Sequence, residues 1–193
     1  MPTGVALRDV REQLFDAADR ILLASGPEAL TSRAVTDGAG CAKGVLHRHF
    51  TDFDDFLAEY VLDRSTRMDA RTAALRAGEG TVTDNVAEAL TSLFGSVAVA
   101  IVALVTFRDG LRARLRETWP AGVPVLTGAA ELLADYLEDE RSRGRIAAGA
   151  DTATLGAILI GTGHLLFADR TGPRPAPEDV RRAVAAIIPV VAT

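Results

Sequence analysis

Residues 14–57 read LFDAADRILLASGPEALTSRAVTDGAGCAKGVLHRHFTDFDDFL. Apolar residues recur at helical spacing in this stretch, and Gly26, Pro27 and Gly40 interrupt the pattern. Thr31 stands where an N-cap belongs, and Gly40 can adopt the positive φ that ends a helix. The predicted helices span 6–25, 32–39 and 42–49. A short helix, a turn with glycine and a second short helix predict a helix-turn-helix.

Residues 40–50, GCAKGVLHRHF, hold the only lysine, two of the three histidines and the only cysteine of the chain. His47 and His49 would point about 200° apart on a helix, whereas zinc-binding histidines on one helix stand four residues apart. No second cysteine supports Cys41, so we expect no metal site. No base and orienting partner accompany Cys41 either, and we expect it to fill the turn as a small buried residue.

The charge of this segment is locally positive. No acidic residue occurs between positions 38 and 51, which include Lys43 and Arg48, although the whole chain has a net charge of -5 and a pI near 5.2. The short side chains of Ala42, Gly44 and Val45 would let the second helix approach a DNA groove closely. Two cations also suit an ordinary solvated helix, and the charge pattern leaves both interpretations open.

The stretch from Arg11 to Leu57 resembles the N-terminal DNA-binding domain of the TetR family of transcriptional regulators, over about a quarter of the chain. The resemblance is carried by Ala18, Gly26, Leu30, Thr31, Val35, Ala39, Gly40, Gly44, Leu46, His49, Phe50, Asp52 and Leu57. It implies that base edges face Lys43, Gly44 and Val45. It also implies phosphate contacts for Thr31, Ser32, Arg33, His47, Arg48 and His49.

Several positions depart from the family pattern. His47 stands where the family usually has tyrosine, Phe53 where it has a phosphate-contacting lysine, Ala42 where it has serine or threonine, and Cys41 where it has valine. These changes leave the expected fold intact but remove phosphate contacts. The logarithm of the DNA affinity falls linearly with the logarithm of the salt concentration, and each charged contact that is lost reduces the steepness of this line by about one.

Helical spacing continues to the C-terminus, and we predict an all-α fold of about nine helices. The remaining predicted helices span 52–76, 82–105, 107–118, 123–143, 152–169 and 177–188. By the resemblance, residues 1–51 form a helix-turn-helix DNA-binding domain and residues 52–193 form a helical ligand-binding and dimerisation domain. Four arginines of the second region, at positions 108, 112, 114 and 116, are expected to form a solvated face, and the alternative is a position where the predicted helix 52–76 meets the sensor domain.

The composition favours a globular cytoplasmic protein. Hydrophobic residues make up 48% and charged residues 24%, which excludes a disordered tail. A lone cysteine forms no intramolecular disulfide, and the N-terminus lacks the apolar core of a signal peptide. The uncharged run 89–107 is long enough for a bilayer, but its polar residues and unbiased flanks favour a buried central helix, and we expect no membrane partner.

The resemblance further implies a homodimer through helices 152–169 and 177–188. The apolar and small residues expected there are Leu155, Gly156, Ile158, Leu159, Gly161, Gly163, Leu166, Phe167, Val180, Val184, Ile187 and Ile188. An ordinary intramolecular core is the alternative for these positions. A two-fold dimer would place its two DNA-reading helices about 34 Å apart, which fits a pseudo-palindromic double-stranded operator.

The region after residue 52 is also where an effector should bind. The residues expected to line its site are Phe94, Phe107, Trp119, Tyr136 and His164, although each also suits a plain core. The many aliphatic side chains favour a small hydrophobic effector, and no catalytic spacing or cofactor motif is present. We therefore expect a ligand-responsive repressor without enzymatic activity. The alternative is a small-molecule-binding protein of the same fold with an impaired DNA-binding head.

Overall fold

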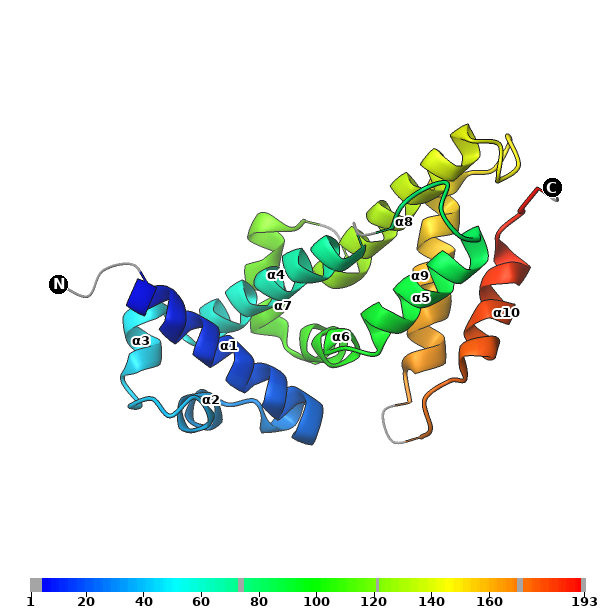
Figure 1. Ribbon diagram of the computed structural model, residues 1–193. Helices are drawn as coiled ribbons and strands as arrows, with labels where there is room; N and C mark the ends of the chain where they lie inside the picture. Colours follow the sequence, from blue (N-terminus) through cyan, green and yellow to red (C-terminus); the bar gives the residue numbers. More distant parts are fainter. Residues whose placement is uncertain (1–4, 73–74, 121, 170–171, 192–193) are drawn as a thin grey trace. The chain divides into compact units, whose positions relative to one another are not determined.

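The computed structural model describes residues 5–72, 75–120, 122–169 and 172–191 (Figure 1). Within these ranges the chain is all-α, as predicted, with ten α-helices, a 3-10 turn at Pro27–Ala29, and one isolated β-bridge between Ile146 and Val190. The helices are α1 (Val5–Ser25), α2 (Ser32–Gly38), α3 (Val45–His49), α4 (Phe53–Thr72), α5 (Val82–Phe94), α6 (Ala98–Phe107), α7 (Asp109–Thr118), α8 (Pro124–Ser142), α9 (Thr152–Phe167) and α10 (Pro177–Ile187).

The helices pack into two compact units. The first unit contains residues up to 63 together with 100–121, and the second contains 64–99 together with residues from 122 onwards. The helices α4 and α6 therefore each have residues in both units. This division by packing follows a different criterion from the predicted domain boundary between residues 51 and 52, which stays a prediction.

An aromatic cluster forms the core of the first unit. The ring of Phe56 lies 5.1 Å from that of Phe50 and 5.6 Å from that of Phe15, measured between centroids. Tyr60 is fully buried and donates a hydrogen bond of 2.5 Å to Oδ1 of Asp19. Because these residues come from α1, from the end of α3 and from α4, the cluster fixes the helix-turn-helix against the first half of α4.

Close helix contacts hold the second unit together. A Cβ on Gly156 would lie 2.5 Å from the carbonyl oxygen of Ala130, so α9 approaches the backbone of α8. The α10 residues Val180 and Val184 are buried at 1% exposure, and α10 packs on α5. The apolar stripe predicted for the last helix thus contributes to the core of its own chain.

Three predicted helix boundaries were wrong. The predicted helix 82–105 is two helices, α5 and α6, which meet at an angle of 56°. Gly95 ends α5, and the hydroxyl of Ser96 hydrogen bonds to the Leu93 carbonyl and accepts the Ala98 N–H, so it replaces helical bonds at the break.

The other two boundaries differ by a few residues. The predicted helix 42–49 begins at Val45, because a turn closed by the Val45 N–H and the Ala42 carbonyl precedes it. The predicted helix 52–76 ends at Thr72, while residues 73–74 lie outside the described part of the chain and residues 75–77 are not helical.

The apolar run that includes residues 89–107 falls on the break between α5 and α6. Among the described helices none is by itself long and apolar enough to cross a membrane, and only the bent α5–α6 pair passes that test by length and composition. The expected buried position of this run is confirmed for most of its side chains, including Leu90, Leu93, Ile101 and Leu104.

Candidate nucleic-acid interface and ligand cavities

Local hydrogen bonds build the helix-turn-helix. The hydroxyl of Thr31 accepts the N–H of Ala34 and caps α2, as predicted. The buried hydroxyl of Thr36 donates to backbone carbonyls within α2, and the Thr36 carbonyl in turn accepts the N–H of Cys41 at 2.9 Å. Gly40 has a φ of 66°, which lets the chain reverse between α2 and α3.

The α3 helix presents polar residues around one buried anchor. Leu46 is completely buried, whereas Lys43, Gly44, His47 and Arg48 are exposed. Val45 and His49 are half-buried. The open space beside Gly44, where a Cβ would meet no atom within 4 Å, leaves this side of the helix accessible to another molecule.

The start of α2 completes the group of predicted DNA contacts. Thr31 and Arg33 are exposed and Ser32 is half-buried. Arg33 lies 3.5 Å from Asp37 in an exposed pair, which is weak enough for a phosphate to compete with it. All nine predicted DNA-contacting residues thus lie in one helix-turn-helix, and their contacts with DNA stay a prediction.

The metal and nucleophile alternatives receive no support from this geometry. Among the described residues no group of three or more His, Cys, Asp or Glu side chains could hold a metal ion. Cys41 is half-buried rather than buried, and its thiol contacts the Ala39 carbonyl oxygen at 3.6 Å. The thiol therefore lies within the turn, beside a backbone acceptor.

The start of α4 is acidic and aromatic: it consists of Asp52, which precedes the helix, and Phe53, Asp54 and Asp55 of its first turn. The N–H of Asp55 donates to Oδ1 of Asp52 at 2.8 Å, and the N–H of Thr51 donates to Oδ2 of Asp55 at 2.8 Å. This reciprocal pair caps the helix, as the sequence predicts. The bond from the Asp55 N–H, assisted by Arg114, holds the pKa of the Asp52 carboxyl below its usual value.

Two arginines from α7 and its N-cap contact this first turn of α4. Arg114 lies 2.8 Å from Oδ2 of Asp52 and 3.3 Å from Oδ1 of Asp55. Arg108 donates to Oδ1 of Asp54 at 2.6 Å, and its guanidinium carbon lies 5.1 Å from the centre of the Phe53 ring. The expected solvated arginine face was therefore wrong for Arg108 and Arg114. The sequence shows that these residues are charged. Their acidic partners follow only from the packing of α7 on α4.

The five residues predicted to line an effector site are divided between the two units. Phe107 and Trp119 belong to the first unit, where Phe107 is 86% exposed. Phe94, Tyr136 and His164 belong to the second unit. The buried Phe94 ring and the His164 ring lie 6.1 Å apart, measured between centroids. The Nδ1 atom of His164 is buried and has no hydrogen-bond partner among the described residues.

Tyr136 takes part in a polar network at the other end of α5. Its hydroxyl donates to Oε1 of Glu140 at 2.6 Å and accepts the side-chain N–H of Asn85 at 2.9 Å. Glu140 is fully buried, also accepts the N–H of Gly78, and pairs with Arg145 at 3.2 Å. Burial raises the pKa of Tyr136 to about 12, and the Glu140 hydrogen bond acts in the same direction.

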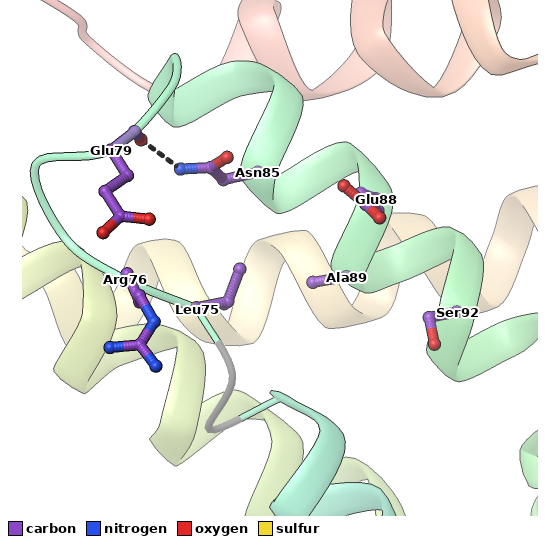
Figure 2. A pocket seen from close by; sticks show the side chains of 7 residues that line it. All are labelled: Leu75, Arg76, Glu79, Asn85, Glu88, Ala89 and Ser92. Atoms are coloured by element: carbon purple, nitrogen blue, oxygen red, sulfur yellow. Dashed lines mark hydrogen bonds between the residues drawn. The ribbon is translucent and has the colours of Figure 1, made fainter.

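Two surface cavities lie on either side of the exposed Glu88–Ser92 face of α5 in the second unit. One has a volume near 310 Å³ and is lined by Leu75, Arg76, Glu79, Asn85, Glu88, Ala89 and Ser92 (Figure 2). The other, near 680 Å³, is lined by Asp84, Ala87, Glu88, Thr91, Ser92, Pro177 and Arg181. Both linings combine polar and apolar surface in similar amounts. None of the five predicted effector residues lines either cavity.

Comparison with known proteins identifies the fold. Residues 14–60 match the family model of the bacterial regulatory proteins of the tetR family. Reduced NemR of E. coli shares 16% identity at a TM-score of 0.77, over 96% of this chain and 100% of its own. A putative TetR-family regulator of Mesorhizobium loti shares 18% identity at 0.70, over 95% of each chain. No curated protein matches the chain.

A third similar structure is a complex with a ligand. The transcriptional regulator FadR of Bacillus subtilis, in complex with stearoyl-CoA, shares 18% identity at a TM-score of 0.68, over 92% of this chain and 97% of its own. Likeness at these identities shows the fold alone. The resemblance to the TetR family is confirmed: residues 14–60 form its N-terminal helix-turn-helix segment, and the described chain has the fold of solved TetR-family regulators.

Proposed function

We propose that the chain is a ligand-responsive transcriptional repressor that binds a pseudo-palindromic operator as a homodimer and is released by a small hydrophobic effector. The observation that carries the proposal is the exposure of Lys43, just before α3, and of His47 and Arg48 on α3, whose Leu46 is buried. The match of residues 14–60 to the tetR family supports it. In this proposal Lys43, Gly44 and Val45 face base edges, and Arg48 contacts phosphate.

The homodimer would form around α9. Ala157, Ile158, Gly161 and Leu165 follow one another at helical spacing and are exposed, Leu165 at 77%. No atom lies within 4 Å of the place where a Gly161 Cβ would be, so a second helix has room to approach. The outer side of α10 would border this surface, because the α10 residues Val180 and Val184 are already buried within the chain. An apolar stripe of this kind favours association with a second copy.

The effector would bind in the region after residue 52, and Phe94 and His164 of the second unit are the proposed contacts. The unpartnered, buried Nδ1 of His164 beside Phe94 supports this assignment, because such a group requires a polar partner. The similar fold of FadR from Bacillus subtilis, whose structure is a complex with stearoyl-CoA, supports a hydrophobic effector. An effector that shifts the repressor from mostly bound to mostly free needs about 10⁴-fold stronger binding to the released state.

We further propose that the chain has no enzymatic activity and works in the cytoplasm, where its operator is. A binding protein with an impaired DNA-binding head is the second candidate, and a specific observation favours it. Phe53 packs against Phe56 and under Arg108, so it supplies no cation to DNA at the position where the family resemblance predicts a lysine.

The deciding experiment measures binding of the purified protein to a labelled duplex from the region upstream of its own gene, at two salt concentrations. The variant Lys43→Ala/Arg48→Ala removes two cations from the helix-turn-helix. The matched control Arg143→Ala/Arg182→Ala removes two exposed cations from the second unit.

We expect tight, salt-sensitive binding that the first variant loses and the control keeps. An absence of wild-type binding at low salt would contradict the repressor and favour the binding protein with an impaired head. Loss of binding in both variants to the same extent would show that total charge, rather than α3, governs the interaction.

A further inference from the structure

We propose that Arg108 and Arg114 are positioning residues for DNA binding, which neutralise the acidic first turn of α4 and hold it beside α3. The inference rests on the proposed DNA binding. It adds to the DNA-binding domain two residues that lie more than 50 positions after Asp55 in the sequence. Their contacts with Asp52, Asp54 and Asp55 all lie within the first unit.

The charge of the isolated head makes such neutralisation necessary. Residues 31–55 contain three cations, at positions 33, 43 and 48, and four carboxylates, at positions 37, 52, 54 and 55, which gives a net charge of -1. Arg108 and Arg114 change this total to +1. A DNA-binding surface requires positive potential, and the acidic start of α4 gives residues 31–55 the opposite sign unless Arg108 and Arg114 are included.

The acidic turn lies within electrostatic range of the predicted contacts. Asp52 follows His49 by three residues, so their Cα atoms are at most about 11 Å apart. This separation is close to the Debye length of about 10 Å at 0.1 M salt. Three unpaired carboxylates there would repel the phosphates that His47 and Arg48 are proposed to approach.

The geometry of α7 is built for this contact. A Cβ on Gly110 would collide with a carboxylate oxygen of Asp54, so glycine at this position leaves room for the Asp54 carboxylate beside the first turn of α7. The guanidinium of Arg114 spans two carboxylates, and that of Arg108 lies between Asp54 and the Phe53 ring. A planar fork suits such paired contacts better than an ammonium group.

A third arginine on the same helix provides the contrast. Arg112 pairs with Asp109 of its own helix and donates to the carbonyls of Val105 and Thr106. These partners lie on α6 and α7 rather than on α4, and Arg112 carries the same charge. The variant Arg112→Gln therefore changes the net charge as each of the other two does, but leaves the acidic turn neutralised.

The experiment measures anisotropy of the labelled upstream duplex with the full-length protein at two salt concentrations, and thermal unfolding of each variant by circular dichroism. The variants are Arg108→Gln/Arg114→Gln, Arg108→Lys/Arg114→Lys, Arg112→Gln, and the double glutamine variant with Asp52→Asn and Asp54→Asn added. Asparagine at position 52 retains a good N-cap, so the added changes remove charge and keep the helix start.

We expect the double glutamine variant to bind about tenfold more weakly at low salt, with a smaller loss at high salt because the repulsion is screened. The added asparagines should restore the affinity, and the lysine variant and Arg112→Gln should bind like the wild type. If the double glutamine variant fails to fold, the lysine variant decides, since weak binding by a folded lysine variant overturns neutralisation.

The contrary outcomes are distinct. Normal binding by the folded double glutamine variant overturns the inference and leaves the proposed function standing. Weak binding that the asparagines do not restore also overturns it, in favour of a purely structural role. An absence of wild-type binding overturns the proposed function, and the inference with it.

Discussion

A Cβ on Gly163 would lie 2.5 Å from Cε2 of Phe94, closer than two non-bonded carbon atoms pack. Glycine at this position of α9 therefore lets the aromatic ring of α5 lie directly against the helix backbone. Two residues earlier, Gly161 faces open space. Two glycines in one helix thus have different roles, which their sequence context does not distinguish.

The first prediction compares these two glycines. Gly163→Ala should lower the free energy of unfolding by about 1–3 kcal/mol, because Phe94 and Leu90 must move to make room for the methyl group. Gly161→Ala should raise it by up to about 1 kcal/mol through helix propensity. Urea denaturation of both variants at one protein concentration checks this. Equal effects of the two substitutions would contradict it.

The second prediction concerns the buried carboxylate of Glu140. Glu140→Gln should lower the free energy of unfolding by about 3–5 kcal/mol, because Arg145 loses its buried partner and the Tyr136 hydrogen bond weakens. The control Glu138→Gln removes an exposed carboxylate that pairs with Arg141 on the same helix, and should change stability far less. A loss as small as that of the control would show that water reaches the Glu140 site.

The third prediction concerns stability at high pH. The native state holds the pKa of Tyr136 at about 12, above the usual value of 10, so it favours the protonated phenol. The resulting stabilisation is fully present below about pH 10 and is lost as the pH rises through about 12. Denaturation of the wild type and of Tyr136→Phe between pH 8 and 12 measures it. The difference in stability between the two proteins should shrink above pH 10, and a constant difference would refute the assignment.

The fourth prediction tests the proposed dimer surface. Leu165→Arg should leave the helical circular dichroism spectrum unchanged but convert the dimer to a monomer in sedimentation experiments, because it places a charge in the proposed α9 contact. Leu23→Arg is the matched control, since Leu23 is also an exposed leucine but lies on α1. A dimer that survives Leu165→Arg, or a wild type that is monomeric, would rule out this surface.

The fifth prediction separates folding from recognition in the helix-turn-helix. Gly40→Ala should destabilise the protein by about 1–2 kcal/mol, because alanine disfavours the φ of 66° found there. Gly44→Ala should fold like the wild type, since its φ is -79° and its surroundings are open. It should nevertheless weaken DNA binding if this side of α3 faces the bases. Thermal unfolding and duplex binding of both variants distinguish the two effects.

Local sequence signals predicted much of the fold. The N-cap Thr31 lies where the sequence predicts it, because an N-cap depends on residues within one turn. The break at Gly95 was missed because the apolar pattern continues through it. A buried helix that is apolar on all sides has no face whose periodicity would reveal a change of direction.

Long-range pairs were beyond the sequence. The residues Glu140, Tyr136 and Asn85 form one network, yet their positions carry no signal that links them. The same holds for Arg114 and its two carboxylate partners on α4. The predicted DNA contacts are confined to 19 consecutive residues, from 31 to 49, so local reasoning could bring them together. The predicted effector residues come from distant segments of the chain, and reasoning from local sequence could not show which of them lie near one another.

The first compact unit is discontinuous, and this limits how the protein can be recombined. Residues 100–121 pack with residues 1–63, so a DNA-binding head excised at the end of α3 or within α4 would lack the segment with Arg108 and Arg114. Engineers who graft this head onto another sensor would have to transplant two stretches of chain rather than one. Modularity along the gene and modularity in the folded molecule therefore differ in this protein.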